Sequence, residues 1–397
     1  MPGPLEGIRV LDFTSFIQGS ASLSLAEMGA EVIKVEDREH GDPGRSIFIL
    51  ERIGMSAMFY TFNRGKKSIA LDYGKPAGVE ITLQLAARSD VIIHNQRPGV
   101  MDRLGLGYEA VKAINSRIIY AEGSGWGNRG PRRERPALDM VGQAGSGITS
   151  ITGDPKGYPM PAGFFLADNE CSVQLTIGVL AALFARERTG VGQRFDTSLL
   201  GGSIRAQAFE MGSYLVTGQL PQRAGRGHSV TGLNPLWHTY RTSDGYFAIA
   251  FFRPDKWPEF FRVVGRPDLM EDPRFATVDV SRLHGEDLRD ILDEIFITRT
   301  SAEWEELLLP LRQPVSPVVT YDRLKDDPQV LANDYIVNAE HPSAGIVQVI
   351  GHPISFSETP AEISGVAPEL GQHTEELLLE LGYSWERITA LRDQEII

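Results

Sequence analysis

The chain has 397 residues, 42% apolar and 23% charged, which is enough apolar material for more than one packed core. Its 39 Lys and Arg stand against 52 Asp and Glu, and the net charge of −13 argues against a general binder of nucleic acid or of anionic membranes. One cysteine excludes an intrachain disulfide framework and a cysteine-based zinc site, and the 8 histidines lack the spacing of a zinc hydrolase. We therefore expect a metal-free protein of the reducing cytoplasm, without a leader or a membrane-spanning segment.

The first third of the chain alternates short apolar strands with helices. Strands are predicted at 8–13, 31–36, 68–71, 90–93 and 117–120, and helices at 19–28, 76–88 and 108–114. This alternation is typical of an α/β fold with a Rossmann-like, doubly wound parallel sheet. Ligands of such sheets bind outside the carboxyl ends of the strands.

The remainder of the chain is predicted to hold a long helix, a hairpin and several shorter elements. The long helix covers 171–186 and ends at Gly190, and the hairpin turns at 243–245. The other predictions are helices at 256–264, 286–296, 302–311, 375–381 and 385–392 and a strand at 346–350. The predicted domains are the first part of a large domain at 1–217, a linker at 218–236, a small α+β domain at 237–322, and a linker with the C-terminal return to the large domain at 323–397.

Small residues and cations both gather where the predicted strands end. The loops 18–22 and 123–125 could cradle a phosphate or an oxyanion with backbone amides, or could be ordinary tight turns. The first loop lacks the GxGxxG spacing of dinucleotide-binding loops, so NAD is not expected. The cations, which are either phosphate ligands or part of a solvated surface, are Arg38, Arg64, Lys66, Lys67, Arg97 and Arg103.

Asp168, together with Asn169 and Glu170, precedes the predicted long helix. A helix N-cap is the simplest interpretation, because a carboxylate there accepts free N–H groups and meets the positive end of the helix dipole. The same position would also present an ionised carboxylate as a nucleophile. Cys171 is the alternative nucleophile, although its place in an apolar helix favours a packing role.

A series of motifs, spread in order over nearly the whole chain, resembles the family III CoA-transferases, the group of formyl-CoA and carnitine CoA-transferases. The motifs are 4–13, 29–36, 41–43, 63–68, 95–99, 104–105, 188–193 and 371–374. The resemblance implies a Rossmann-like large domain, a small α+β domain, and a homodimer in which the two chains form interlocked rings. It implies no permanently bound cofactor, since coenzyme A or acyl-CoA is the substrate and a small carboxylic acid is its partner.

The resemblance also implies which residues form the site. Asp168 matches the family's catalytic aspartate, which would attack an acyl-CoA thioester to give a mixed anhydride and then an aspartyl-CoA thioester. An acceptor carboxylate would then take over the CoA. The family's CoA contacts fall on Ile17, Gln18, Arg38, Leu71, Asp72, Tyr73, Gly74, Asn95, Gln96, Arg97 and Arg103.

Two alternative functions go with the same fold. α-Methylacyl-CoA racemases need a histidine–aspartate pair with the histidine upstream of the aspartate, and no histidine lies between Asn95 and Gly227. A non-catalytic CoA-binding subunit is the other alternative. Within the transferases, formyl-CoA/oxalate exchange is disfavoured, because the glycine-rich loop of those enzymes is reduced here to Gly225, Gly227 and Gly232.

Overall fold

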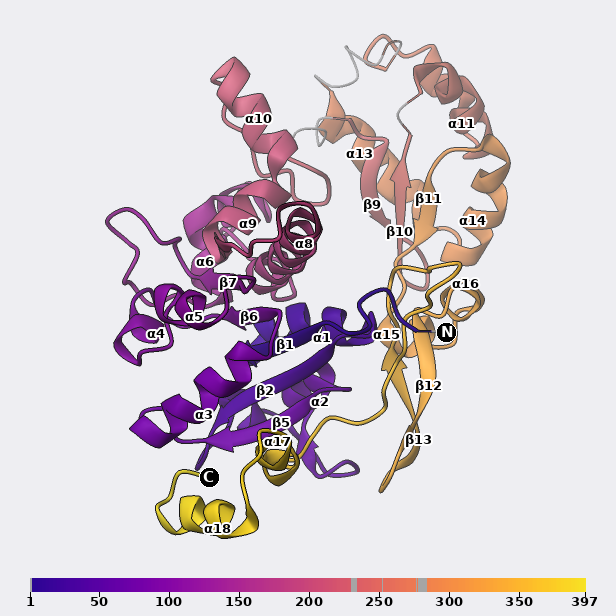
Figure 1. Ribbon diagram of the computed structural model, residues 1–397. Coiled ribbons are helices and arrows are strands. Elements are labelled where there is room, and N and C mark those ends of the chain that lie inside the picture. The colour runs from indigo at the N-terminus through magenta and orange to yellow at the C-terminus, as the bar shows by residue number, and fades with distance from the viewer. Residues whose placement is uncertain (1, 230–233, 252, 276, 278–283) are drawn as a thin grey trace. The chain divides into compact units, whose positions relative to one another are not determined.

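The computed structural model describes residues 2–229, 234–251, 253–275, 277 and 284–397 (Figure 1). The chain divides into two compact units. The first comprises Met1–Ser146, Phe164–Ala206 and Asp327–Ile397, and the second comprises Gly147–Gly163 and Gln207–Asp326. The predicted small domain at 237–322 lies within the second unit. None of the helices in the described residues has the length and apolar character that crossing a bilayer requires.

Six strands form the central sheet of the first unit, in the order β5-β2-β1-β6-β7-β8. They are β1 (Arg9–Phe13), β2 (Glu31–Asp37), β5 (Lys67–Leu71), β6 (Val91–His94), β7 (Ile119–Ser124) and β8 (Arg194–Ser198). Every neighbouring pair is parallel. The order is that of a doubly wound Rossmann sheet, so this prediction is confirmed, and the crevice where the winding reverses lies between β1 and β6.

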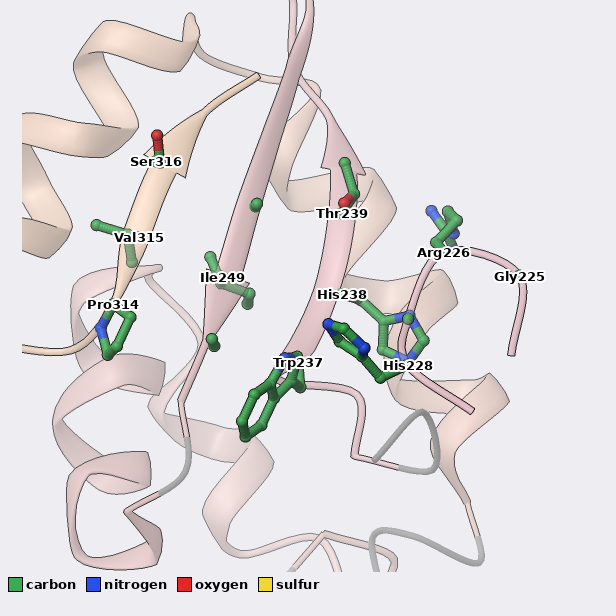
Figure 2. Close-up of a pocket in the computed structure, with 13 residues that line it drawn as sticks. Gly225, Arg226, His228, Trp237, His238, Thr239, Ile249, Pro314, Val315 and Ser316 are labelled. Atoms are coloured by element: carbon green, nitrogen blue, oxygen red, sulfur yellow. The ribbon is translucent and has the colours of Figure 1, made fainter. Parts of the chain in front are cut away.

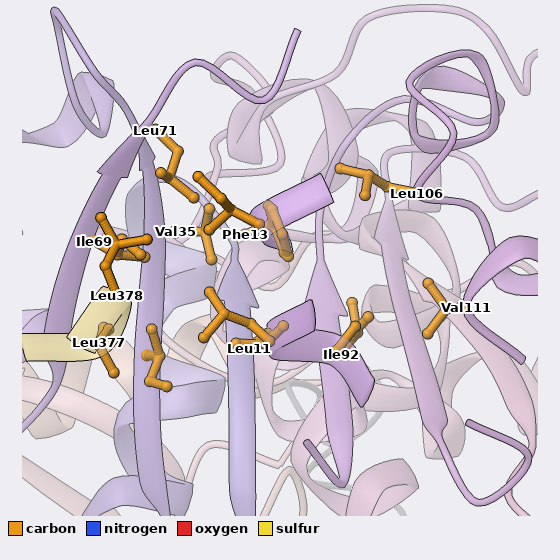
Figure 3. Packing of buried hydrophobic residues seen from close by; sticks show 14 of the residues in the cluster. Leu11, Phe13, Val35, Ile69, Leu71, Ile92, Leu106, Val111, Leu377 and Leu378 are labelled. Carbon is orange, nitrogen blue, oxygen red and sulfur yellow. The ribbon is translucent and has the colours of Figure 1, made fainter. Parts of the chain in front are cut away.

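An apolar core covers each face of this sheet, because side chains alternate along every strand. On one face, Leu11 and Ile92 pack with Leu377 and Leu378 (Figure 3), which come from the distant C-terminal part of the chain. The helices on this face are α3 (Pro76–Ala87), α5 (Tyr108–Ile114), α17 (Thr374–Glu380) and α18 (Trp385–Asp393). The helices on the other face are α1 (Gly19–Glu27) and α8 (Leu166–Thr189).

Smaller elements complete the first unit. They are β3 (Ile49–Leu50), β4 (Met55–Ser56), α2 (Ala57–Asn63), α4 (Val100–Arg103), α6 (Asp139–Ser146), α9 (Leu199–Ala206), α16 (Pro328–Ala332), and the hairpin of β12 (Ile336–His341) and β13 (Gly345–Ile350). The sequence did not predict β8, α6 or α9. Only Ser198 of β8 is buried, so this edge strand lacks the apolar run that marks the others.

The second unit is a small α+β body around a three-stranded antiparallel sheet, ordered β11-β10-β9. The predicted hairpin is confirmed, since Arg241 pairs with Tyr246 across its turn. Tyr240 stacks on Phe296 in the core, with ring centroids 4.9 Å apart. The elements are α7 (Ile148–Ile151), α10 (Ala208–Thr217), β9 (Trp237–Arg241), β10 (Tyr246–Ala250), α11 (Trp257–Val263), α13 (Gly285–Phe296), α14 (Ser301–Leu308), β11 (Val315–Pro317) and α15 (Tyr321–Leu324).

A buried ion pair connects β1 to the segment before β5. Lys66 Nζ lies 2.9 Å from Asp12 Oδ2, and neither side chain is exposed. Lys66 also donates to Gly19 O, Ser22 Oγ and Asn63 Oδ1. Lys66 is therefore neither a phosphate ligand nor part of a solvated surface, and both sequence-based interpretations of it are wrong.

The carboxylate of Asp12 organises the chain that follows β1. Burial opposes its ionisation, but the charges of Lys66 and Lys34 outweigh this and hold its pKa well below the ordinary value. Its Oδ1 accepts from the backbone N–H of Thr14 at 2.8 Å, and Lys34 Nζ donates to Thr14 O at 2.7 Å. The segment that leads to residues 17 and 18 is thus fixed by buried charges.

Lys66→Met should lower the free energy of unfolding by about 3–5 kcal/mol, because it removes the ion-pair partner of the buried Asp12 and leaves only the more distant charge of Lys34. Lys67→Met is the matched control. Lys67 pairs with Glu31 at 2.9 Å and Glu376 at 2.7 Å in partly exposed surroundings, so its loss should cost at most about 1 kcal/mol. Urea unfolding followed by circular dichroism measures both variants. Equally small losses in the two would show that the Lys66–Asp12 pair does not constrain the fold.

Candidate active site

The CoA contacts implied by the resemblance lie at one edge of the parallel sheet, because each of them ends a strand or follows its carboxyl end. Ile17 and Gln18 follow β1, Arg38 follows β2, Leu71 to Gly74 end and follow β5, and Asn95, Gln96, Arg97 and Arg103 follow β6. Asn95 connects the segments that follow β1 and β6, the two strands between which the winding of the sheet reverses. Its Oδ1 accepts from Ser15 N at 2.9 Å, and its Nδ2 donates to Ser15 O at 3.0 Å.

Burial separates these residues into two groups. The side chains of Ile17 and Leu71 are 3% and 0% exposed, so only their backbone groups could face a ligand. Arg38 is half-buried, and Arg97 and Arg103 are exposed. The arginines are therefore accessible cations at this edge of an otherwise acidic protein.

Asp168 lies in the first turn of α8 and is not its N-cap. The N-cap residue is Phe165, and the capping carboxylate comes from Asp139 at the start of α6. Asp139 Oδ1 accepts from Ala167 N at 2.7 Å and from Asp168 N at 3.3 Å. The predicted capping role of Asp168 is therefore wrong, because Asp139 already satisfies these N–H groups.

The Asp168 carboxylate sits in surroundings that disfavour its charge. It is half-buried, and burial together with the negative charge of Asp139 raises its pKa to about 6, while a hydrogen bond from the Gln18 side chain partly offsets the rise. A carboxylate with a raised pKa is more basic, and at neutral pH this one is still mostly ionised. These are the properties that a carboxylate nucleophile requires.

Gln18 reaches Asp168 from a constrained loop. Phe16, two residues earlier, has φ of 60°, a left-handed conformation that costs free energy for a residue with a side chain. Its N–H donates to Asp42 Oδ1 at 3.2 Å. A Cβ on Gly123 would lie 2.5 Å from Gln18 Oε1, so the glycine at the end of β7 leaves the space that the Gln18 side chain occupies.

Cys171 is not a competing nucleophile. Its side chain is fully buried among the apolar residues between α8 and the sheet. Burial and the neighbouring charge of Asp168 raise the pKa of the thiol to about 12. The thiol therefore stays protonated at neutral pH, and the packing role is the one that the structure supports.

Sequence reasoning missed Asp139 altogether. The residue lies 29 positions before Asp168, outside any local capping pattern. The long helix was predicted to begin at residue 171, whereas α8 begins at Leu166. The free N–H groups of residues 167 and 168 were therefore not recognised as groups that need a capping acceptor.

A separate cavity of about 450 Å³ lies within the second unit, beside β9, β10 and β11. Trp237, His228 and His238 line one part of it (Figure 2). A Cβ on Gly227 would lie 2.7 Å from His238 Cε1, so glycine lets this segment pack against β9. Gly232, the third glycine singled out from the sequence, lies outside the described residues. The cavity's lining includes none of the residues implied as the site.

Asp168→Asn should stabilise the folded protein at neutral pH. Because the folded pKa of about 6 lies above the ordinary 3.8, the wild type loses stability as pH rises between these two values. The variant lacks this loss. Its free energy of unfolding at about pH 7.5 should therefore exceed that of the wild type by about 1–2 kcal/mol, a figure reduced for the partial exposure of the carboxylate. Near pH 4 the two proteins should be equally stable. Urea unfolding at both pH values tests this. A variant less stable than the wild type at the higher pH would refute it.

The chain resembles known proteins over its whole length. Residues 5–374 match the sequence profile of CoA-transferase family III. The chain is 33% identical to an acyl-CoA transferase of Fusarium pseudograminearum, over 100% of this chain and 88% of that protein. It is 31% identical to human succinyl-CoA:glutarate CoA-transferase, over 95% of this chain and 86% of the relative.

A solved structure shares the fold. The crystal structure of a CAIB/BAIF family protein from Brucella suis superposes with a TM-score of 0.86 at 30% sequence identity, covering 96% of this chain and 100% of that one. The profile match covers most of the chain, and the relatives are more than 30% identical over nearly all of it. The chain belongs to CoA-transferase family III.

Proposed function

We propose that this protein moves CoA from a donor acyl-CoA to an acceptor carboxylate, with Asp168 as the nucleophile. The observation that carries the proposal is the half-buried Asp168 carboxylate, which has a raised pKa and a hydrogen bond from Gln18. The names of the relatives supply the reaction class, and that of the human relative includes succinyl-CoA and glutarate. A dicarboxylic acid is accordingly the first acceptor to test.

In this proposal the reaction proceeds through three covalent intermediates, which are two mixed anhydrides and the aspartyl-CoA thioester between them. An Asp168 oxygen attacks the thioester carbon, the C–S bond breaks, and CoA leaves as a thiolate. The acyl group remains on Asp168 as a mixed anhydride. The thiolate attacks the aspartyl carbonyl and expels the donor acid, which leaves an aspartyl-CoA thioester. The acceptor carboxylate attacks this thioester and releases the thiolate, which leaves a second mixed anhydride. The thiolate then attacks the acceptor's acyl carbon, forms the new acyl-CoA and frees the Asp168 carboxylate. No proton is gained or lost, so the chemistry needs no general acid or base.

In this proposal Gln18 stabilises negative charge on the oxygens of Asp168. Its side-chain amide donates to the carboxylate before the reaction. In the acylated enzyme the same N–H faces the aspartyl carbonyl oxygen, which becomes an oxyanion when the thiolate attacks. In this proposal Gln18 therefore stabilises both addition steps at the aspartyl carbon. Asp139 acts only indirectly, by capping α8 and raising the pKa of Asp168.

In the same proposal the carboxyl edge of the sheet binds CoA. Arg38, Arg97 and Arg103 are accessible cations of that edge, and they are available for phosphate groups. The buried residues Ile17 and Leu71 contribute through their backbone. The thioester end would then point toward Gln18, which follows the strand next to the crevice.

The placement of His94 disfavours racemisation. Its ring packs edge-on against Tyr120 at 5.3 Å, and its Nε2 lies 3.4 Å from Glu122 Oε1. Tyr120 belongs to the core on the face of the sheet opposite α8, which carries Asp168. His94 and Asp168 thus lie on different faces and do not form the pair that moving an α-proton requires.

The proposed assembly is a homodimer of interlocked chains. α10 buries none of its residues, although Phe209, Leu215 and Val216 are 62%, 73% and 87% exposed. A ten-residue helix with no packed face is only marginally stable alone in water, so a second surface should cover it. In the first unit, Val173 and Ile177 form an apolar stripe on the outer face of α8, which is also available for a partner chain.

Exchange of CoA should fall by about three orders of magnitude or more in Asp168→Asn, because an amide cannot form the anhydride. Cys171→Ala, the matched control one turn along α8, should keep exchange within about fivefold of the wild type. The assay follows transfer from labelled succinyl-CoA to a panel of carboxylates. For the wild type, kcat/KM should rise as pH increases through about 6, since the nucleophile must be ionised. Near-normal exchange in the Asn variant would overturn the proposal.

Sedimentation velocity at nanomolar concentration should give a single species of twice the chain mass. Val216→Glu should weaken this dimer or prevent its folding, because it places a charge in a covered apolar surface. Gln219→Glu adds the same charge just beyond α10 and should leave the dimer intact. A folded wild-type monomer at nanomolar concentration, or equal effects of the two variants, would contradict the interlocked assembly.

A further inference from the structure

The last residues of the chain lie against the ends of β2 and β5. Asp72 N donates to Ile396 O at 2.8 Å, and Lys75 Nζ donates to Glu395 O at 3.1 Å. Ile396 is 4% exposed and belongs to the same core as Leu71. This short segment therefore supports the loop after β5, which carries several of the proposed CoA contacts.

Glu395 has an unusual conformation within this segment. Its φ is 55°, in the left-handed region. Glu395 N donates to Arg392 O and Ile396 N donates to Leu391 O, both at 2.9 Å, which is the hydrogen-bond pattern of a Schellman motif that ends α18. Glycine is the favoured residue at this position, because a Cβ is strained there. The helix end alone therefore does not explain a glutamate.

The side chain of Glu395 reaches one of the proposed phosphate ligands. Its Oε2 lies 3.9 Å from an Nη of Arg38, with the two side chains 68% and 31% exposed. A pair this long and this exposed contributes little to stability. Its charge still matters to an anion that approaches Arg38, because the carboxylate neutralises the cation and repels phosphate.

We propose that Glu395 is the counter-charge that Arg38 gives up when a CoA phosphate binds, so that Glu395 weakens the hold of the enzyme on CoA. This inference rests on the proposed CoA site at the carboxyl edge of the sheet. A transferase must release its acyl-CoA product as well as bind its donor, so a carboxylate that weakens CoA binding is useful. This use would explain why a strained glutamate is kept beside Arg38. Glu395 is thus a residue that tunes affinity and has no part in the chemical steps.

Isothermal titration of free CoA into the wild type and two variants tests this. Glu395→Gln removes the charge and keeps the strain, whereas Glu395→Gly removes both. Each should bind CoA about two- to fivefold more tightly at low ionic strength, and the gain should shrink in about 0.5 M salt. Glu395→Gly should also melt at a higher temperature than Glu395→Gln, because its backbone is relaxed. Asp393→Asn, an equal charge change on an exposed neighbour, should leave the affinity unchanged.

Arg38→Gln separates this inference from the proposed function. If it weakens CoA binding while Glu395→Gln leaves the affinity unchanged or lowers it, the counter-charge role is overturned and the CoA site stands. If Arg38→Gln has no effect on CoA binding, Arg38 is not a CoA contact and the role of Glu395 fails with it. The nucleophilic role of Asp168 is tested independently by exchange in its own variant. Equal tightening in Asp393→Asn would reduce the effect to net charge and would also overturn the proposal.

Discussion

The buried pair of Lys66 and Asp12 is the constraint on which the site depends. Taking two opposite charges out of water gains little net free energy, because the cost of desolvation offsets most of their attraction. What the pair fixes is geometry: Asp12 holds Thr14, and Lys66 holds the carbonyl of Gly19. The loop between these residues carries Gln18. The position of the group that hydrogen-bonds Asp168 therefore follows from a network whose charged side chains are fully buried.

Asp139 has a comparable indirect influence on the nucleophile. By accepting the free N–H groups of α8, it leaves the Asp168 carboxylate to face Gln18 instead of its own helix. Its charge also makes ionised Asp168 less favourable, which raises the basicity of the nucleophile. One distant carboxylate thus supplies both the orientation and the reactivity. The cost appears as lost stability of the folded protein at neutral pH, an exchange of stability for activity that is common at catalytic sites.

What could be predicted from the sequence was whatever depends on local pattern. The strands β1, β2 and β6 are buried on both faces, so they appear as apolar runs and reveal the doubly wound sheet. The polar edge strand β8 has no such run and was missed. Within the site, the strand-end residues follow from topology. The pairing of Lys66 with Asp12 and of Asp168 with Asp139 could not be predicted in this way. The members of each pair come from segments that are far apart in the sequence and are brought together only by folding.

The central claim is that the carboxylate of Asp168 becomes covalently acylated during turnover. The most direct measurement is mass spectrometry of the enzyme after incubation with acyl-CoA and hydroxylamine, which attacks activated carboxyl groups but not a resting carboxylate. The account predicts inactivation together with one hydroxamate, at Asp168, in the peptide that contains residues 164–170, and neither effect when acyl-CoA is omitted. Modification of Cys171, or continued CoA exchange in enzyme whose carboxyl groups remain unmodified, would contradict it.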